Sequence, residues 1–241
     1  MEIFPIKTRK INPPKDNLFE VLNNYCPELK EKDILLITSK VVSIHQGRCL
    51  PTKLVKNKDN LIKEEADAYI DRNNVPGKHA VLTIKNNTLI PSAGIDESNA
   101  NQYYILWPNN PQKEAKKIYQ HLKKRFSIKN IGVIITDSRT IPLRYGTIGI
   151  SIGFYGIKPL KNYIGEKDIF GRKLKMTKSN IVDALAAAGV LVMGEGEEQT
   201  PMALIRNANF VKFTNRDNYR ELLVPLKKDI YYSLLKNFHN L

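Results

Sequence analysis

The chain contains a short apolar segment that is followed at once by charged and hydroxyl side chains. Residues 130–136, NIGVIIT, have the length and the β-branched content of a buried strand. Asp137, Ser138 and Arg139 follow directly, and Arg144 comes shortly after them. Ligands of open α/β proteins gather beyond the carboxyl ends of strands, so this junction predicts a ligand site. The alternative is that Asp137 caps a turn and that the arginines form surface ion pairs.

Hydrophobic periodicity along the rest of the chain predicts alternating strands and helices. Strands are expected at residues 2–7, 33–39, 130–136, 147–156 and 207–214, with a hairpin over 79–92. Helices are expected at residues 16–26, 60–72, 111–126, 179–194 and 219–238. This irregular alternation predicts a mixed α/β (α+β) fold. The chain length fits one large domain or two small ones, and one domain over residues 1–241 is expected. The polar loop 156–178 is long enough to be functional or mobile.

The charge balance favours an anionic partner. The chain has 38 basic and 24 acidic residues, a formal net charge of +14. A charge that serves only solubility is the other interpretation, and the lysines of helix 111–126 fit a solvated face better than a nucleic-acid surface. Two cysteines cannot staple a chain of 241 residues, so reduced thiols and a cytoplasmic location are expected. No apolar run reaches the ~18–20 residues of a membrane helix, so no membrane partner is expected.

Three further stretches carry side chains suited to cations or phosphates. Asp96 lies in SAGIDESNA (residues 92–100), and Glu195 lies between two glycines in VMGEGEEQT (residues 192–200). Each also fits an exposed turn or a solvated loop. Ser39 and Lys40 end a predicted strand, where a hydroxyl and an ammonium can hold phosphates. Hard oxygen ligands suit Mg²⁺ or Mn²⁺, whereas the four histidines lack metal-ligand spacing and no Walker A motif occurs.

Five stretches, in this order, resemble the coenzyme F420-0:L-glutamate ligase (CofE) family, the γ-glutamyl ligases of a 5-deazaflavin cofactor. They are ITSKVVSIHQGR, SAGIDESNA, GVIITDSRTIPLRYGTIGISIG, GIKPLKNYIGEKDIFGRKLKMT and DALAAAGVLVMGEGEEQTPMALIR, within residues 34–206. The resemblance implies the mixed α/β fold of that family in an intertwined homodimer, which would cover the apolar segment 181–193. It also implies a ligase that joins L-glutamate to a carboxylate of an anionic cofactor. GTP would be the co-substrate, with two Mg²⁺ or Mn²⁺ ions and K⁺ as helper.

The resemblance also implies roles for individual residues. The divalent-metal ligands would be Asp96, Asp137, Ser138 and Glu195. The nucleotide contacts would be Ser39, Lys40, Asn99 and the loop residues Met193, Gly194, Gly196, Glu197, Glu198, Gln199 and Thr200. All reactants are anionic, so Arg139 and Arg144 are expected to act in catalysis and Lys158 and Lys161 to bind substrate.

The N-terminal loop departs from the family pattern. The family carries a glycine-rich nucleotide loop after an FP strand, whereas this chain has Lys7, Thr8, Arg9 and Lys10 there, and Ile44 replaces a common lysine. Thr8, Arg9 and Lys10 are expected to contact the nucleotide instead, and ATP is an alternative to GTP. The departures leave two acceptors open, F420-0 and a folate. A basic RNA- or nucleotide-binding module without ligase activity is the alternative of a different class, although few aromatic residues interleave its basic patches.

Overall fold

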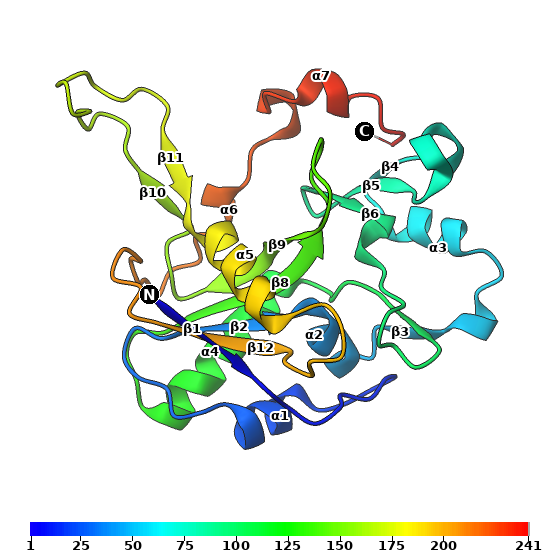
Figure 1. Ribbon diagram of the computed structural model, residues 1–241, viewed down its shortest axis with the longest axis horizontal. Coiled ribbons are helices and arrows are strands. Elements are labelled where there is room, and N and C mark those ends of the chain that lie inside the picture. The colour runs from blue at the N-terminus through cyan, green and yellow to red at the C-terminus, as the bar shows by residue number, and fades with distance from the viewer. Residues whose placement is uncertain (241) are drawn as a thin grey trace.

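The computed structural model describes residues 1–240, and its centre is a five-stranded sheet (Figure 1). In sheet order the strands are β1 (Glu2–Ile6), β12 (Met202–Arg206), β2 (Ile34–Thr38), β8 (Gly132–Arg139) and β9 (Ile148–Tyr155). β2 and β8 run parallel, from Ile34 beside Gly132 to Thr38 beside Thr136, and the other neighbours are antiparallel. Two carboxyl ends therefore meet at one edge of the sheet, as the predicted ligand site requires.

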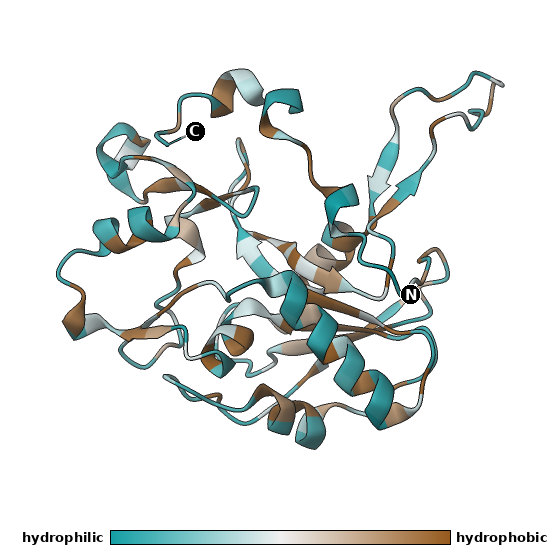
Figure 2. Ribbon diagram, turned by 180° about the vertical axis from the view of Figure 1, so that it is seen from behind, coloured by the Kyte–Doolittle hydropathy of each residue, from teal (hydrophilic) through white to brown (hydrophobic). Residues whose placement is uncertain are grey.

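Helices cover both faces of this sheet. On one face lie α1 (Leu18–Tyr25), α2 (Ser39–His45) and α4 (Pro111–Phe126), and on the other lies α5 (Ile181–Met193). Successive side chains of a strand point to opposite faces, so Leu35 and Ile37 pack with α1 and α4 whereas Ile34 and Leu36 pack with α5. Figure 2 shows α4 with its hydrophilic side turned outward, which agrees with the solvated face expected for its lysines.

A second group of elements packs beside the central sheet. Its three-stranded sheet has the order β4 (Ala68–Ile70), β5 (Leu82–Lys85) and β6 (Thr88–Pro91), with α3 (Lys58–Glu65) against it. β3 (Cys49–Pro51) pairs with β7 (Tyr103–Ile105). Short 3-10 turns span Thr52–Leu54, Arg72–Asn74, Pro76–Lys78, Ser92–Gly94 and Leu226–Lys228. The predicted hairpin over 79–92 is confirmed, with Asn86 and Asn87 at positive φ in its turn.

The segment 156–178 and the C-terminal segment differ from the expected loop and helix. β10 (Leu160–Asn162) pairs with β11 (Lys178–Asn180), and the two form an arm that projects from the molecule (Figure 1). The helix predicted over 219–238 is wrong. Only α6 (Tyr219–Leu222) and α7 (Tyr232–Leu235) form there, because Pro225 lacks the N–H that a helix interior needs. The chain then returns to the second group, where His239 pairs with Tyr69.

Most predicted strands of the central sheet and the helices that cover it are confirmed within a few residues, but β12 was not expected and two further predictions need correction. The strand expected at 207–214 is wrong, because β12 ends at Arg206 and only Phe213 forms a bridge, to Ile157. The helix expected at 60–72 ends at Glu65, since residues 68–70 pair with β5 as β4. The seven-residue helix α2 was not expected. The mixed α/β class itself is confirmed, and among residues 1–240 no helix has the length and apolarity to cross a membrane.

Candidate active site

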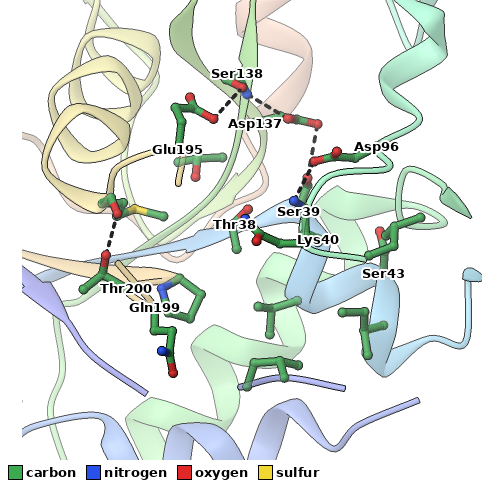
Figure 3. A pocket seen from close by; sticks show the side chains of 18 of the residues that line it. Thr38, Ser39, Lys40, Ser43, Asp96, Asp137, Ser138, Glu195, Gln199 and Thr200 are labelled. Carbon is green, nitrogen blue, oxygen red and sulfur yellow. Dashed lines mark hydrogen bonds and ion pairs between the residues drawn. The ribbon is translucent and has the colours of Figure 1, made fainter. Parts of the chain in front are cut away.

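A cavity of about 720 Å³ opens at the edge of the sheet where β2 and β8 end (Figure 3). Its walls come from segments that are far apart in the sequence: residues 8–13, 38–44, 94–107, 136–138 and 190–201. All seventeen of the predicted metal and nucleotide residues line it, among them Asp96, Asp137 and Glu195. The cavity lining thus also includes Thr8, Arg9, Lys10, Ser39, Lys40, Asn99, Ser138, Met193, Gly194, Gly196, Glu197, Glu198, Gln199 and Thr200. The structure brings together stretches that the sequence could only name separately.

Asp137 lies near the carboxyl end of β8, and the groups that donate hydrogen bonds to its carboxylate are uncharged. The backbone N–H of Ser138 donates to its Oδ1 at 2.7 Å, the hydroxyl of Ser39 donates to Oδ2 at 3.1 Å, and the indole Nε1 of Trp107 also donates to Oδ2. Burial raises the pKa of Asp137 to about 6, although these hydrogen bonds oppose the shift. Within residues 1–240 no lysine or arginine forms an ion pair with this carboxylate. Its negative charge is therefore not balanced by the protein.

Asp96, by contrast, is paired with a lysine. The Lys40 Nζ lies 2.6 Å from its Oδ2, and the backbone N–H and hydroxyl of Ser98 donate to its Oδ1 at 2.7 and 2.8 Å. Burial alone would raise the pKa of Asp96, but Lys40 and Ser98 outweigh it and bring the pKa below its ordinary value. The predicted metal ligand Asp96 and the predicted phosphate contact Lys40 therefore neutralise each other's charge in this structure.

Glu195 is linked to Asp137 through Ser138, whose backbone N–H donates to Asp137 and whose hydroxyl donates to Glu195. The Ser138 hydroxyl donates to Glu195 Oε2 at 3.4 Å, and the Thr147 hydroxyl lies 3.5 Å from Oε1. α5 ends just before this residue, where Gly194 adopts φ +76, a conformation that glycine reaches without strain. The end of α5 and the end of β8 therefore face each other across the top of the cavity, as Figure 3 shows.

The rest of the loop after α5 is tied to two other walls of the cavity. Asn99 Nδ2 donates to the carbonyl of Gly196 at 2.8 Å, and the backbone N–H of Thr8 donates to the carbonyl of Gln199 at 2.9 Å. Glu198 folds back and accepts from the Gly196 N–H at 2.8 Å. These bonds join the N-terminal loop, the Asp96 loop and the loop 193–200 into one wall.

The donor set has the chemistry of a site for a hard divalent cation. Asp137, Ser138 and Glu195 offer carboxylate and hydroxyl oxygens, which Mg²⁺ and Mn²⁺ prefer. No three acidic, histidine or cysteine side chains among residues 1–240 converge closely enough to hold an ion without other ligands. Mg²⁺ is commonly held by one or two carboxylates together with substrate phosphates and water, so this arrangement fits the group. The charge that remains unbalanced on Asp137 supports the same conclusion.

Some predicted residues lie away from the cavity. Arg139 donates to the carbonyl of Leu89 at 3.4 Å, and its Nε has no partner within residues 1–240. Arg144 is exposed on the turn between β8 and β9. Lys158 is exposed, as is Lys161, which lies over the Tyr163 ring on the arm. The four residues do not line the cavity of this single chain, so their catalytic and substrate roles stay predictions.

Arg9 lies at the cavity, but its charged group faces a different partner. Its two terminal nitrogens donate to both carboxylate oxygens of Asp16, at 2.5 and 2.7 Å. Asp16 also accepts from the backbone N–H groups of Asn12 and Asn17, at 3.1 and 2.8 Å. The guanidinium therefore closes the N-terminal loop on itself, a contact that the sequence analysis did not foresee.

A cavity of this kind, with carboxylates and hydroxyls at the carboxyl ends of parallel strands, is typical of enzymes that bind phosphorylated ligands and cations. Residues 5–207 match the family described as F420-0:Gamma-glutamyl ligase. The chain is 33% identical over 245 residues to the coenzyme F420:L-glutamate ligase of Methanococcus maripaludis strain C7, covering 96% of this chain and 97% of the relative. Proteins of the same name from Methanocaldococcus jannaschii and Methanosarcina acetivorans are also similar.

The match to the M. jannaschii protein is 35% identical over 232 residues, 89% of this chain and 90% of the relative. The match to the M. acetivorans protein is 34% identical over 236 residues, 87% of this chain and 89% of the relative. The chain belongs to the F420-0:gamma-glutamyl ligase family. The resemblance drawn from the sequence is thereby confirmed, as is the expectation of an amide-forming ligase rather than a binding module without activity.

Proposed function

We propose that the protein is a γ-glutamyl ligase that joins the amine of L-glutamate to a carboxylate of coenzyme F420-0, with GTP as co-substrate. The named relatives are coenzyme F420:L-glutamate ligases. The observation that carries the proposal is the cavity at the ends of β2 and β8, which is lined by the residues that the resemblance suggests as metal ligands and nucleotide contacts. A folate remains the second acceptor to be tested, because the N-terminal loop departs from the family sequence.

The reaction needs an activated carboxylate. An acceptor carboxylate oxygen attacks the γ-phosphorus of GTP, the bond to the bridging oxygen breaks, and GDP and an acyl phosphate result. The glutamate amine then attacks the acyl carbon, the C–N bond forms, and orthophosphate leaves as the amine gives up a proton. The Lys40 ammonium and the backbone groups of loop 193–200 would hold the phosphates in line with the acceptor.

Asp137, Ser138 and Glu195 would hold the first divalent cation. When bound, such an ion offsets the charge of the triphosphate and polarises the γ-phosphoryl group. Asp96 would join them once Lys40 turns from its carboxylate to a phosphate, which would place a second ion beside it. Ser39, Asn99, Thr8 and Lys10 would contact the nucleotide from the opposite walls. K⁺ as an additional helper rests on the family resemblance alone.

We also propose that the chain works as a homodimer. Leu191 of α5 is 82% exposed, and the arm carries Ile169, Phe170 and Met176 at 92%, 89% and 83% exposure. Apolar surface of this extent is typical of an interface, and a second copy of the chain is the occupant that the resemblance implies. Sedimentation equilibrium should give twice the chain mass for the wild type, and Leu191→Asp should shift it toward one chain mass.

The ligase proposal is tested by following glutamate incorporation. The protein is incubated with labelled L-glutamate, Mn²⁺, K⁺ and either GTP or ATP, with F420-0 in one arm and a folate in the other. We expect F420-0 to gain the mass of one or more glutamyl groups, with one orthophosphate released for each. Glutamate addition to the folate alone would replace the acceptor. If neither acceptor gains mass and no orthophosphate forms, the proposed function is wrong.

A further inference from the structure

Trp107, the only tryptophan of the chain, lies against the carboxylate of Asp137. The side chain is 1% exposed and borders the cavity just after β7. Its indole Nε1 donates to Asp137 Oδ2, the oxygen that also accepts from Ser39. A buried indole N–H needs an acceptor, and here that acceptor is an acidic side chain that forms no ion pair with a lysine or arginine among residues 1–240.

The loop that carries Asp96 makes room for this indole. Gly94 lies two residues before Asp96 and adopts φ +69. A Cβ atom at position 94 would overlap the Nε1 and Cδ1 atoms of Trp107, so any larger residue would push the ring from its place. Glycine at position 94 therefore leaves the space that the indole nitrogen occupies when it contacts Asp137.

Arg48, just before β3, holds the backbone of Trp107 from the other side. Arg48 Nε donates to the Trp107 carbonyl at 3.1 Å, and Arg48 Nη2 donates to Glu65 Oε2 at 2.6 Å. Lys85, only 8% exposed, pairs with the same carboxylate. Burial by itself would raise the pKa of Glu65, but the two cations outweigh it and lower that pKa. Both ends of Trp107, the carbonyl and the indole nitrogen, are thus held by hydrogen bonds.

These contacts decide which part of Asp137 stays available. A carboxylate accepts at about four lone-pair positions. Trp107 and Ser39 occupy Oδ2, and the Ser138 N–H occupies one position of Oδ1. The remaining lone-pair position lies on Oδ1, the oxygen that also accepts from the Ser138 N–H. Ser138 in turn contacts Glu195 through its hydroxyl.

We propose that Trp107 is a positioning residue, which holds Asp137 by its indole N–H so that Oδ1 is presented to the divalent cation. The inference rests on the proposed function for the identity of the reaction, but cation binding tests it without that reaction. Partners that orient a metal-binding carboxylate typically change metal affinity by 10–100-fold when they are removed.

Two substitutions separate the hydrogen bond from simple packing. Trp107→Phe keeps an aromatic ring but has no donor. Trp107→His loses the six-membered ring, yet the imidazole overlays the five-membered part of the indole and places Nε2 where Nε1 was. Mn²⁺ affinity is measured with GDP present from the electron paramagnetic resonance signal of free Mn²⁺. We expect Trp107→Phe to weaken Mn²⁺ binding by about tenfold or more, and Trp107→His by less than about threefold.

The unaltered protein supplies a second measurement, which does not depend on how the variants fold. Because Trp107 is the only tryptophan, its fluorescence should be quenched by paramagnetic Mn²⁺ over the same concentration range in which resonance detects binding. Excess Mg²⁺ should reverse the quenching. Mn²⁺ binding without any change of the tryptophan emission would overturn the proposal.

The remaining outcomes are equally decisive. If the Phe and His variants bind Mn²⁺ as the wild type does, or if the His variant is the weaker of the two, Trp107 acts by packing and the proposal is wrong. If the Phe variant is weaker as expected but no acceptor is glutamylated, the positioning role stands and the proposed function fails. If an acceptor is glutamylated but the variants do not differ from the wild type in Mn²⁺ affinity, the proposed function stands and the positioning role of Trp107 is wrong.

Discussion

Two aspartates at opposite ends of the central sheet show how the molecule treats a buried negative charge. Asp33, just before β2, is 2% exposed and pairs with Arg206, whose Nε lies 3.1 Å from Oδ2. Asp137, at the end of β8, is held by a serine hydroxyl, a backbone N–H and an indole, all uncharged. The first charge is neutralised by the protein, and the second is left for a ligand. A carboxylate fixed by neutral donors is therefore the stronger indication of a cation site.

The largest expected effect comes from exchanging each aspartate for asparagine. Asp137→Asn should lower glutamyl transfer by about a thousandfold, roughly 4 kcal/mol of barrier, because the ligand for the cation loses its charge. It should leave the melting temperature unchanged or higher, since an unbalanced charge is removed. Asp33→Asn should lower stability by about 2 kcal/mol, a drop of about 4–8 °C, with activity within a few-fold. Glutamyl-transfer assays measure the activity and thermal denaturation measures the stability of each variant. A loss of stability in Asp137→Asn with a loss of activity in Asp33→Asn would contradict the comparison.

A smaller effect is expected at Glu195, which approaches Asp137 through Ser138. Glu195→Gln should lower activity by about 10–100-fold and raise the Mn²⁺ concentration needed for half-maximal rate, because one charged ligand becomes neutral. Glu64→Gln, on the exposed side of α3, is the matched control and should leave both quantities unchanged. A Mn²⁺ requirement that does not move in the Glu195 variant would remove this residue from the cation site.

The smallest effect is expected at Asp16, which resembles Asp33 in having an arginine partner. Hydrogen bonds from Arg9 lower the pKa of Asp16 to about 2, below the ordinary 3.8. The pair therefore stabilises the fold above about pH 4, and this contribution is lost as the pH falls through about 2. Arg9→Ala should lower the melting temperature at pH 7 by about 1–3 °C, and the difference should vanish near pH 2.

The same variant also tests the N-terminal loop as a nucleotide contact. Because the guanidinium is engaged with Asp16, we expect nucleotide affinity to fall by less than about threefold in Arg9→Ala. Isothermal titration with GDP and Mn²⁺ measures this, with Lys40→Ala as the comparison that should lose far more. A large loss in the Arg9 variant would mean that Arg9 leaves Asp16 to bind phosphate.

The sequence predicted four of the five strands of the central sheet because short apolar runs rich in β-branched residues are typical of buried strands, but it missed β12. It predicted Asp137, Glu195 and Asp96 as a group only through the family resemblance, since nothing local says which loops meet. The helix α2 was missed because its seven residues, with Val41, Val42 and Ile44, continue the apolar run of β2. The final helix was overpredicted because packing against the second sheet, and not local periodicity, determines the path after Pro225.

The partners that give the site its character were not predictable from the sequence. Trp107 meets Asp137 across 30 positions, and Lys40 meets Asp96 across more than 50. The guanidinium of Arg9 is suited to a phosphate, yet it is bound to the carboxylate of Asp16, seven positions away. Side-chain chemistry is visible in a sequence, but which charges balance each other depends on tertiary contacts.

The most direct test of the central claim is the position of Mn²⁺ in crystals grown with Mn²⁺ and GDP, located by its anomalous scattering. The uncompensated carboxylate predicts an ion roughly 2 Å from Asp137 Oδ1, with Ser138 and Glu195 beside it and the Trp107 indole still on Oδ2. An ion bound elsewhere in the cavity, with the Asp137 carboxylate out of its coordination sphere, would contradict the account.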